Sequence, residues 1–185
     1  MSETFTQSVR INYFEIESED FQILHDIFQN IFPQINRKNN FSEFIYKNTY
    51  FIKKIKRYYI ADILEIAEKY FERYGYRNHE IKRNNYFIEL SRYKCIKNEK
   101  PLRIFGYHKD DNSTTDYKVN TIIFYLEKND TIIGGDLKVK INNKENCIPI
   151  EKRRAICFKG DLLHTPTEVY GEGVRDCIVV QIHRK

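Results

Sequence analysis

The sequence lacks the features that define several large classes of proteins. No segment approaches the roughly 18–20 consecutive apolar residues that a membrane-spanning helix requires, so we expect no membrane partner. The N-terminal segment is polar and contains an acidic residue, and we therefore expect no signal peptide. The chain contains no GxSxG, GxGxxG, HExxH or P-loop motif, so the usual signatures of hydrolase, dinucleotide, zinc-protease and nucleotide sites are missing.

Cysteine is scarce, and its spacing favours a reducing compartment. The four cysteines, Cys95, Cys147, Cys157 and Cys177, are far apart and form no CxxC pair. Three of them lie in apolar, strand-like contexts, which are typical of small buried thiols. We therefore predict reduced cysteines and a cytoplasmic location.

The length and composition indicate one folded domain. A chain of 185 residues and 22.4 kDa is long enough for a single domain spanning residues 1–185. Hydrophobic residues make up 41% and charged residues 31% of the chain, which excludes a disordered protein. The net charge of +5 permits an anionic partner but does not require one, because acidic and basic residues are interleaved.

The N-terminal part of the chain, residues 1–85, shows mainly helical spacing. Apolar residues recur at three- and four-residue steps after Ser18, a candidate N-cap, and Pro33 closes the predicted helix. A longer helix is predicted from near residue 57 to residue 74, with Gly75 as its stop.

Two shorter elements are also predicted in this part. Residues 44–46 are expected to form a short helix that residues 41 and 42 open. Residues 11–16 alternate between apolar and polar side chains, which predicts a strand.

The C-terminal part, residues 86–185, shows short extended runs between turn residues. The predicted strands cover residues 86–93, 119–126, 137–141, 155–158, 167–170 and 174–182. Such a series of strands favours a sandwich or jelly roll over alternating βαβ units. We therefore predict an α+β domain in which helices pack against a β core.

Three residues form a candidate metal site. His108 and Asp110 are two positions apart, so on an extended backbone their side chains point to the same face. An HxD pair alone is common by chance and is compatible with a polar surface loop. With His164 as a third ligand, the set matches the two-histidine, one-carboxylate triad of non-haem Fe(II) oxygenases, which leaves coordination positions open.

Arg175 follows His164 by 11 positions, within an apolar predicted strand. A buried guanidinium needs a fixed anion, and a dicarboxylate ligand offers one in bidentate geometry. The alternative is an ion pair with Asp176 or Glu172 at the edge of the strand.

Together these residues resemble the 2-oxoglutarate- and Fe(II)-dependent oxygenases, in particular their prolyl-hydroxylase-like branch. The resemblance extends from Tyr86 to the C-terminus. It covers the HxD pair, His164 and Arg175, the segment TIIFYL at 121–126 and the turn GGDL at 134–137. It implies a double-stranded β-helix, which is a cupin-like jelly roll, with the metal at its open end.

The resemblance also implies roles for single residues. His108, Asp110 and His164 would hold Fe(II), and Arg175 would pair with the distal carboxylate of 2-oxoglutarate. Tyr125 matches a tyrosine that helps to hold this carboxylate in some members; alternatively, it is a core aromatic with a hydrogen-bonded hydroxyl.

Tyr93 is similar to a further tyrosine of the co-substrate pocket, although its distance from the HxD pair is longer here. Gly134 and Gly135 would supply a turn and take no part in the chemistry.

The implied reaction is hydroxylation of a C–H bond with consumption of O2 and release of succinate and CO2, with ascorbate as a further candidate cofactor. We expect a protein or peptide substrate, such as a prolyl side chain. Gln181 stands where nucleic-acid demethylases carry a second arginine, and collagen-type enzymes usually have lysine where this chain has Arg175. Both observations count against those branches.

Three alternatives remain open at this stage. The same chemistry could act on a nucleic acid or a small molecule, or the jelly roll could be a binding module without turnover. Residues 47–59 mix cations with aromatics as nucleic-acid surfaces do, but we favour a solvated helix face there.

Overall fold

The computed structural model describes residues 11–31, 43–46, 57–76, 86–95, 97, 106–111 and 118–184. These residues contain two helices and eleven strands, and every strand pairing between them is antiparallel. Neither helix in this part of the chain is long and apolar enough to cross a membrane.

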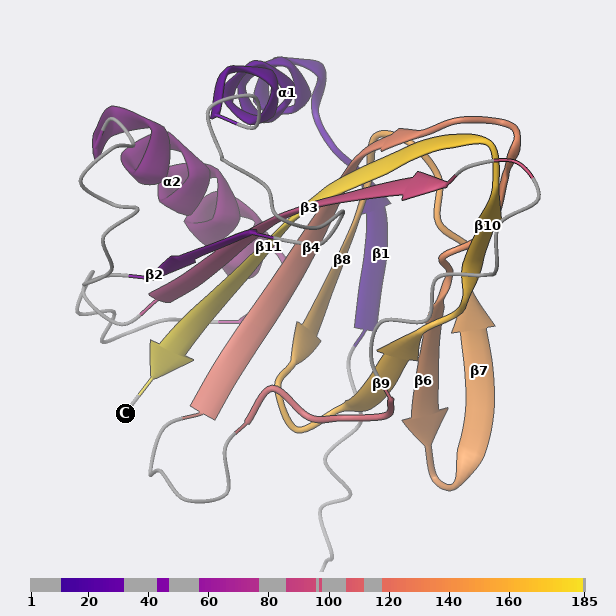
Figure 1. Cartoon of the computed structure of the whole chain (residues 1–185). Helices are drawn as coiled ribbons and strands as arrows, with labels where there is room; N and C mark the ends of the chain where they lie inside the picture. The colour runs from indigo at the N-terminus through magenta and orange to yellow at the C-terminus, as the bar shows by residue number, and fades with distance from the viewer. Residues whose placement is uncertain are drawn as a thin grey trace, which may run out of the picture.

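A six-stranded sheet forms the centre of the molecule (Figure 1). Its strands, in spatial order, are β1 (Ile11–Glu15), β8 (Arg154–Lys159), β4 (Lys118–Lys128), β11 (Gly173–Arg184), β3 (Tyr86–Cys95) and β2 (Glu43–Tyr46). The C-terminal strand β11 therefore lies between β4 and β3 and pairs with both along most of its length.

Two smaller sheets face one side of this large sheet. One has three strands, in the order β7 (Lys144–Ile148), β6 (Leu137–Ile141) and β9 (Leu163–Pro166). The other pairs β10 (Val169–Gly171) with β5 (Ile132–Gly134). In Figure 1 the three-stranded sheet lies on the β1 side of the large sheet, and the β10–β5 pair packs against one end of β3.

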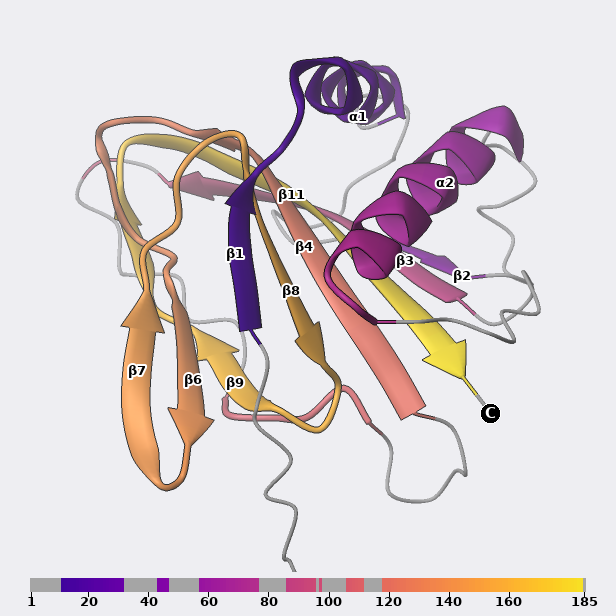
Figure 2. The ribbon, with the colours of Figure 1, turned by 180° about the vertical axis from the view of Figure 1, so that it is seen from behind.

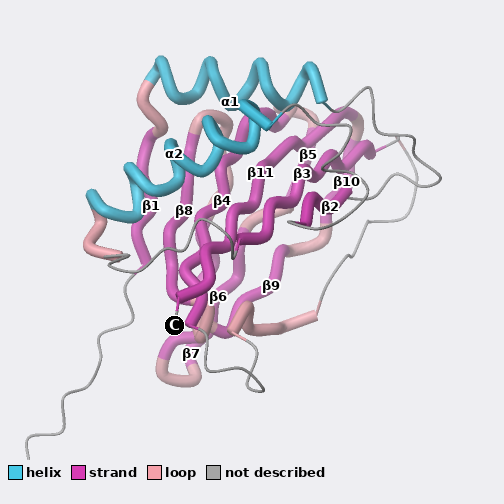
Figure 3. The backbone as a smooth tube through the Cα atoms, turned by 90° about the vertical axis from the view of Figure 1, so that its left-hand side faces the viewer, coloured by secondary structure: helices cyan, strands magenta, loops and turns pink. Residues whose placement is uncertain are grey.

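The two helices cover the opposite face of the large sheet, as the view from behind shows (Figure 2). The helix α1 (Ser18–Ile31) buries Leu24, Ile27 and Phe28, which recur at helical spacing. Together with α2 (Arg57–Arg73) it closes a core of apolar residues against β3, β4, β8 and β11. Figure 3 shows both helices on one side of the stacked strands.

The longer helix ends as its sequence predicts. Gly75 has a φ of 77°, and its N–H donates to the carbonyl of Glu72 at 3.1 Å. The N–H of Tyr76 donates to the carbonyl of Phe71 at 2.8 Å, which completes a Schellman motif. The rings of Phe71 and Tyr76 also pack at 6.1 Å, so the motif carries its usual apolar contact.

Side chains alternate along each strand between the two faces of the large sheet, and the two faces have different roles. On β11, Ile178, Val180 and Ile182 belong to the core beneath the helices. Arg175, Cys177, Val179 and Gln181 point to the other face and line a cavity. The period of two along a strand therefore separates the structural core from the candidate site.

One predicted element is wrong. Residues 44–46, expected as a short helix, belong to strand β2, and Phe44 pairs with Glu89 of β3. A segment this short cannot repay the cost of nucleating a helix, whereas pairing with β3 satisfies its backbone groups through the sheet. Residues 41 and 42, the predicted start of that helix, lie outside the described residues.

The other predicted elements agree with the structure to within a few residues. The strands β5, β7 and β9 were not predicted, and each has three to five residues. Two strands from the first 85 residues, β1 and β2, form the two edges of the large sheet, so this part of the chain contributes strands as well as helices.

We expect the substitution Gly75→Ala to lower the free energy of unfolding by about 1–2 kcal/mol, because a Cβ is disfavoured at this positive φ. Urea unfolding followed by circular dichroism measures this change. Gly106→Ala is the matched control: a Cβ there meets nothing within 4 Å, so its effect should stay within about 0.5 kcal/mol. Equal effects of the two variants would contradict the assignment.

Candidate metal and co-substrate site

Backbone hydrogen bonds bring the three candidate ligands together. His108 and His164 exchange two N–H to carbonyl bonds of 3.0 Å, so the loop that carries the HxD pair runs against β9. The N–H of Asp110 also donates to the carbonyl of Gly160 at 2.8 Å. A side chain at Gly160 would overlap Asp111 and Val119, and glycine therefore permits this close approach.

Each histidine is oriented by its own backbone. Nδ1 of His108 lies 3.0 Å from the carbonyl oxygen of Gly106, and Nδ1 of His164 lies 2.9 Å from that of Leu162. A carbonyl only accepts, so each Nδ1 carries the proton and the lone pair lies on Nε2. Burial lowers the pKa of His164, which favours the neutral imidazole that binds metals.

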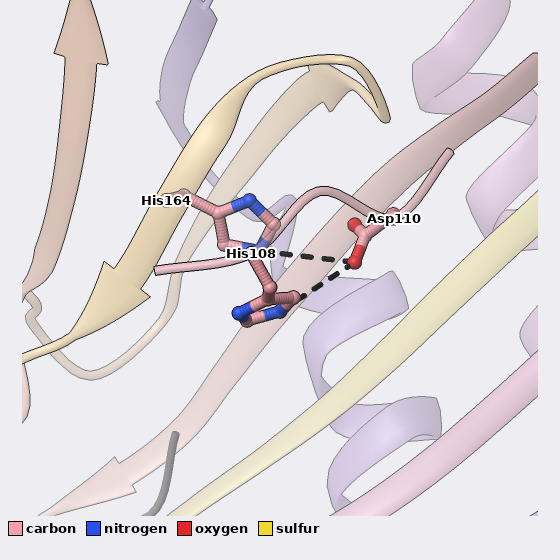
Figure 4. Close-up of side chains that lie close together, drawn as sticks. All are labelled: His108, Asp110 and His164. Carbon is pink, nitrogen blue, oxygen red and sulfur yellow. Dashed lines mark ion pairs between the residues drawn. The ribbon is translucent and has the colours of Figure 1, made fainter. Parts of the chain in front are cut away.

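The two Nε2 atoms face one carboxylate oxygen (Figure 4). Oδ1 of Asp110 lies 3.7 Å from Nε2 of His108 and 3.8 Å from Nε2 of His164. These distances are too long for hydrogen bonds, but the three candidate ligand atoms all lie within 4.8 Å of one another. Two neutral imidazoles and a carboxylate around one point can hold a divalent metal ion with open positions.

Asp110 is itself held in place by β4. The hydroxyl of Thr121 donates to Oδ2 of Asp110 at 2.5 Å, which leaves Oδ1 directed at the histidines. The side chain of Asp110 is 5% exposed and that of His164 is 6% exposed, whereas that of His108 is 41% exposed. The site is therefore open on the His108 side.

A buried guanidinium lies in the same cavity. Arg175 is 4% exposed, and its Nε has no hydrogen-bond partner among the described residues. The guanidinium carbon lies 5.0 Å from the ring centre of Tyr93 and 5.1 Å from that of Tyr125. Aromatic rings stabilise the cation without neutralising it, so the cavity retains a positive charge that suits an anion.

The two tyrosines add neutral donors at the same end of the cavity. Burial raises the pKa of Tyr125 and of Tyr93 well above the usual range, so both hydroxyls stay protonated. The hydroxyl of Tyr125 is fully buried and has no partner within the described part of the chain. A carboxylate at this point would satisfy this hydroxyl and Nε of Arg175 together.

Gly135 makes room for the arginine. A Cβ at Gly135 would lie 2.8 Å from Cδ and 2.9 Å from Nε of Arg175, and the φ of Gly135 is 74°. The side chain of Arg175 therefore packs directly on the backbone of the GGDL turn. Gly135 therefore has a packing role in addition to the predicted turn.

These groups share one cavity of about 270 Å³ between the large sheet and β9. The candidate metal ligands lie at one end, and Arg175, Tyr93 and Tyr125 lie at the other. The cavity therefore combines a candidate metal site with a candidate anion site. It can hold a metal ion and a small chelating acid at the same time.

Comparison with solved structures identifies the fold. A prolyl-4-hydroxylase from Pseudomonas putida superposes with a TM-score of 0.60 at 12% identity over 96% of this chain and 94% of that one. IDO from Bacillus thuringiensis gives 0.59 at 17% identity, over 94% and 91%. A Trichoplax adhaerens prolyl hydroxylase, solved with a hypoxia inducible factor peptide fragment, gives 0.57 at 13%, over 95% and 84%.

The chain has the prolyl-hydroxylase fold. No protein-family model and no curated protein matches the sequence, so the similarity is visible in three dimensions and not in overall sequence. The resemblance that the motifs suggested is thus confirmed at the level of the fold.

In this prolyl-hydroxylase fold, one cavity contains all six site residues that the sequence predicts: His108, Asp110, His164, Arg175, Tyr125 and Tyr93. Of the alternatives, the ion pair between Arg175 and Asp176 does not form, because Asp176 binds Arg92 through two bonds of 2.7 and 2.6 Å on the other face of β11. Within the described residues, the hydroxyl of Tyr125 also lacks the hydrogen bond that the alternative role of a core aromatic predicts. Residues 47–56, most of the basic segment, lie outside the described residues.

Sequence reasoning missed three polar residues that line the cavity: Thr121, Glu89 and Ser91. A signal was available, because each lies at an alternate position of a predicted strand and interrupts an apolar pattern. Without a register, however, the sequence alone could not show which face of these strands meets the metal site.

We expect Thr121→Val to weaken binding of a divalent metal by about 10- to 100-fold, because the substitution removes the hydroxyl that orients Asp110. Isothermal titration of the metal-free protein with Mn(II) measures this affinity. Thr131→Val, at an exposed position away from the cavity, should leave the affinity unchanged. An unaltered affinity in Thr121→Val would show that the carboxylate needs no such support.

Proposed function

We propose that this protein is a 2-oxoglutarate- and Fe(II)-dependent dioxygenase that hydroxylates a C–H bond. The observation that carries the proposal is the presence of the two-histidine, one-carboxylate cluster and the buried Arg175 in one cavity. We also propose that the large sheet and the smaller sheets that face it form a double-stranded β-helix. The prolyl-hydroxylase fold of the chain supports this choice.

The residues fit the proposed cofactors. Nε2 of His108, Nε2 of His164 and Oδ1 of Asp110 would hold Fe(II), and their single negative charge suits a divalent ion that must keep open positions. Arg175, with the hydroxyl of Tyr125, would receive the distal carboxylate of 2-oxoglutarate. When bound, the metal and co-substrate supply the activation of O2, with succinate and CO2 as products.

The protein itself would orient the ligands and exclude water. Nε of Arg175 and the hydroxyl of Tyr125, which have no partner among the described residues, would fix one end of the co-substrate, and the apolar side chains of Ile123, Leu137 and Val179 line the cavity beside it. No nucleophile or general base is required for this chemistry, which agrees with the absence of the common hydrolase motifs. Ascorbate would act only as an accessory reductant.

For the substrate, we propose a side chain of a protein or peptide, with a prolyl residue as the first candidate. Structural neighbours that are named prolyl hydroxylases support this choice, and one of them was solved with a peptide. The competing substrate is a small molecule, because the cavity is small.

The substitution His108→Ala should abolish both stoichiometric Fe(II) binding and succinate formation, because it removes one of the three proposed metal ligands. The side chain of His108 is 41% exposed, so the substitution should leave the core intact. Anaerobic iron titration and succinate release from 2-oxoglutarate measure the two effects. His25→Ala on α1 is the matched control and should keep both properties. Full iron occupancy in His108→Ala would refute the ligand assignment.

The substitution Arg175→Met should raise the concentration of 2-oxoglutarate that half-saturates the protein by at least about 30-fold, because a charged bidentate contact is lost. Succinate formation at varied 2-oxoglutarate measures this requirement. Arg154→Met, which changes an arginine that pairs with Glu151 outside the cavity, should leave it unchanged. An unchanged requirement in Arg175→Met would mean that another cation anchors the co-substrate.

A further inference from the structure

Tyr107 attaches the loop that carries the first candidate ligand to a strand on the far side of the three-stranded sheet. Its hydroxyl donates to Oε2 of Glu145 on β7, and Nζ of Lys140 on β6 lies 4.2 Å from the centre of its ring. Both contacts join the loop to the β6–β7 hairpin. No residue of this hairpin belongs to the candidate metal cluster, so the contacts have no part in the site described above.

Tyr107 and His108 point to opposite faces of the three-stranded sheet. His108 forms a bridge with His164 of β9, and both side chains line the cavity. Because neighbouring residues of an extended segment alternate between faces, the side chain of Tyr107 lies on the outer face. Lys140 and Glu145 are cross-strand partners, and Tyr107 contacts both of them there. The tyrosine therefore crosses β9 and β6 on the outside of the sheet, while the histidine faces the metal site.

The carboxylate that accepts this hydrogen bond is itself held in place. Oε1 of Glu145 lies 2.8 Å from Nζ of Lys138, and Oε2 receives the hydroxyl of Tyr107. Lys138 and Glu145 are diagonal neighbours across β6 and β7, a position from which long side chains can interact. A hydrogen bond to a carboxylate is also stronger than one to a neutral acceptor. The hairpin thus offers the tyrosine an oriented, charged partner.

The contact lies on the side of His108 that the other backbone bonds of the loop do not reach. After His108, the N–H of Asp110 donates to the carbonyl of Gly160 at 2.8 Å. At His108, the bridge to His164 is isolated and belongs to no longer ladder. Tyr107 supplies an attachment before His108, whose side chain is 41% exposed. The main chain thus orients the imidazole, and the tyrosine keeps this part of the loop against the sheet.

We infer that Tyr107 and Glu145 are positioning residues that hold His108 at the metal site from the outer face of the three-stranded sheet. The inference rests on the metal site of the proposed function and adds the β6–β7 hairpin to the elements that maintain it. The apparent affinity for a metal scales with the fraction of molecules in which every ligand is in place. Loss of the contact lowers this fraction and weakens metal binding, although no ligand is removed.

Isothermal titration of the metal-free full chain with Mn(II) tests this role. Tyr107→Phe keeps the ring near Lys140 and removes the hydroxyl, so the dissociation constant should rise about 5- to 10-fold, as expected for one lost hydrogen bond. Glu145→Ala should raise it by at least as much. Glu145→Gln keeps an acceptor oxygen for the hydroxyl, and its affinity should stay within about twofold of that of the unsubstituted chain.

Further variants separate this role from a general effect of the substitutions. Tyr170→Phe removes the hydroxyl of an exposed tyrosine on β10 and is the matched control, which should leave the affinity unchanged. In the double variant Tyr107→Phe/Glu145→Ala the two losses should not add, because both substitutions remove the same contact. Additive losses would show that the two residues act independently and would contradict the inference.

Hydrogen exchange measures the position of the loop without any metal. The N–H groups of His108 and Asp110 donate to the carbonyls of His164 and Gly160, so they exchange when the loop opens. In Tyr107→Phe these two amides should exchange about 5- to 10-fold faster than in the unsubstituted chain, whereas the amides of β11 should keep their rates. Unchanged exchange at His108 would mean that the tyrosine does not hold the loop.

The outcomes separate the inference from the proposed function. An Mn(II) affinity of Tyr107→Phe within twofold of that of the unsubstituted chain overturns the positioning role, as does a loss in Glu145→Gln equal to that in Glu145→Ala. If the unsubstituted chain binds no Mn(II), the proposed function is overturned, and hydrogen exchange alone decides whether Tyr107 holds the loop. Circular dichroism verifies that each variant is folded. If Tyr107→Phe is not, the variants of Glu145, whose side chain is 45% exposed, decide the question.

Discussion

The candidate site depends on the pairing of β11 with β3 on one side and β4 on the other. This register sets Arg175 beside Tyr93 and sets Cys177 opposite Tyr125, so that side chains distant in sequence share one face. A slip of one residue would turn Arg175 into the helix-covered core and would bring Asp176 into the cavity. The extensive pairing of β11 therefore fixes the chemistry of the cavity as well as the fold.

The metal end depends on a second, smaller set of backbone contacts. The bridge between His108 and His164 is isolated and belongs to no regular strand pair, yet it aligns the loop with β9. Each imidazole then bonds to a carbonyl two residues earlier in its own segment, which fixes the tautomer without any further side chain. A short loop can thus be a precise ligand holder because its orientation comes from the main chain.

Much of this could be predicted from the sequence, because the relevant signals are local. Ser18, Gly75 and the apolar periodicity mark the two helices, and the His, Asp and Arg residues are chemically distinctive. Residues 44–46 were misassigned because their strand exists only through its partner β3. Pairing between distant segments also determines the irregular register of β4 near Asp176 and the positions of Thr121 and Glu89. No local sequence pattern records such pairing.

One face of the large sheet forms the core that stabilises the fold, and the other face lines the cavity of the candidate site. Beneath the helices, the buried carboxylate of Asp176 is matched by Arg92, and the aromatic residues pack on one another. In the cavity, Nε of Arg175 and the hydroxyl of Tyr125 are buried without partners among the described residues, an arrangement that costs free energy in the absence of a ligand. The apolar core on the opposite face offsets this cost, and unsatisfied donors beside three candidate metal ligands are the arrangement that a preformed binding site requires.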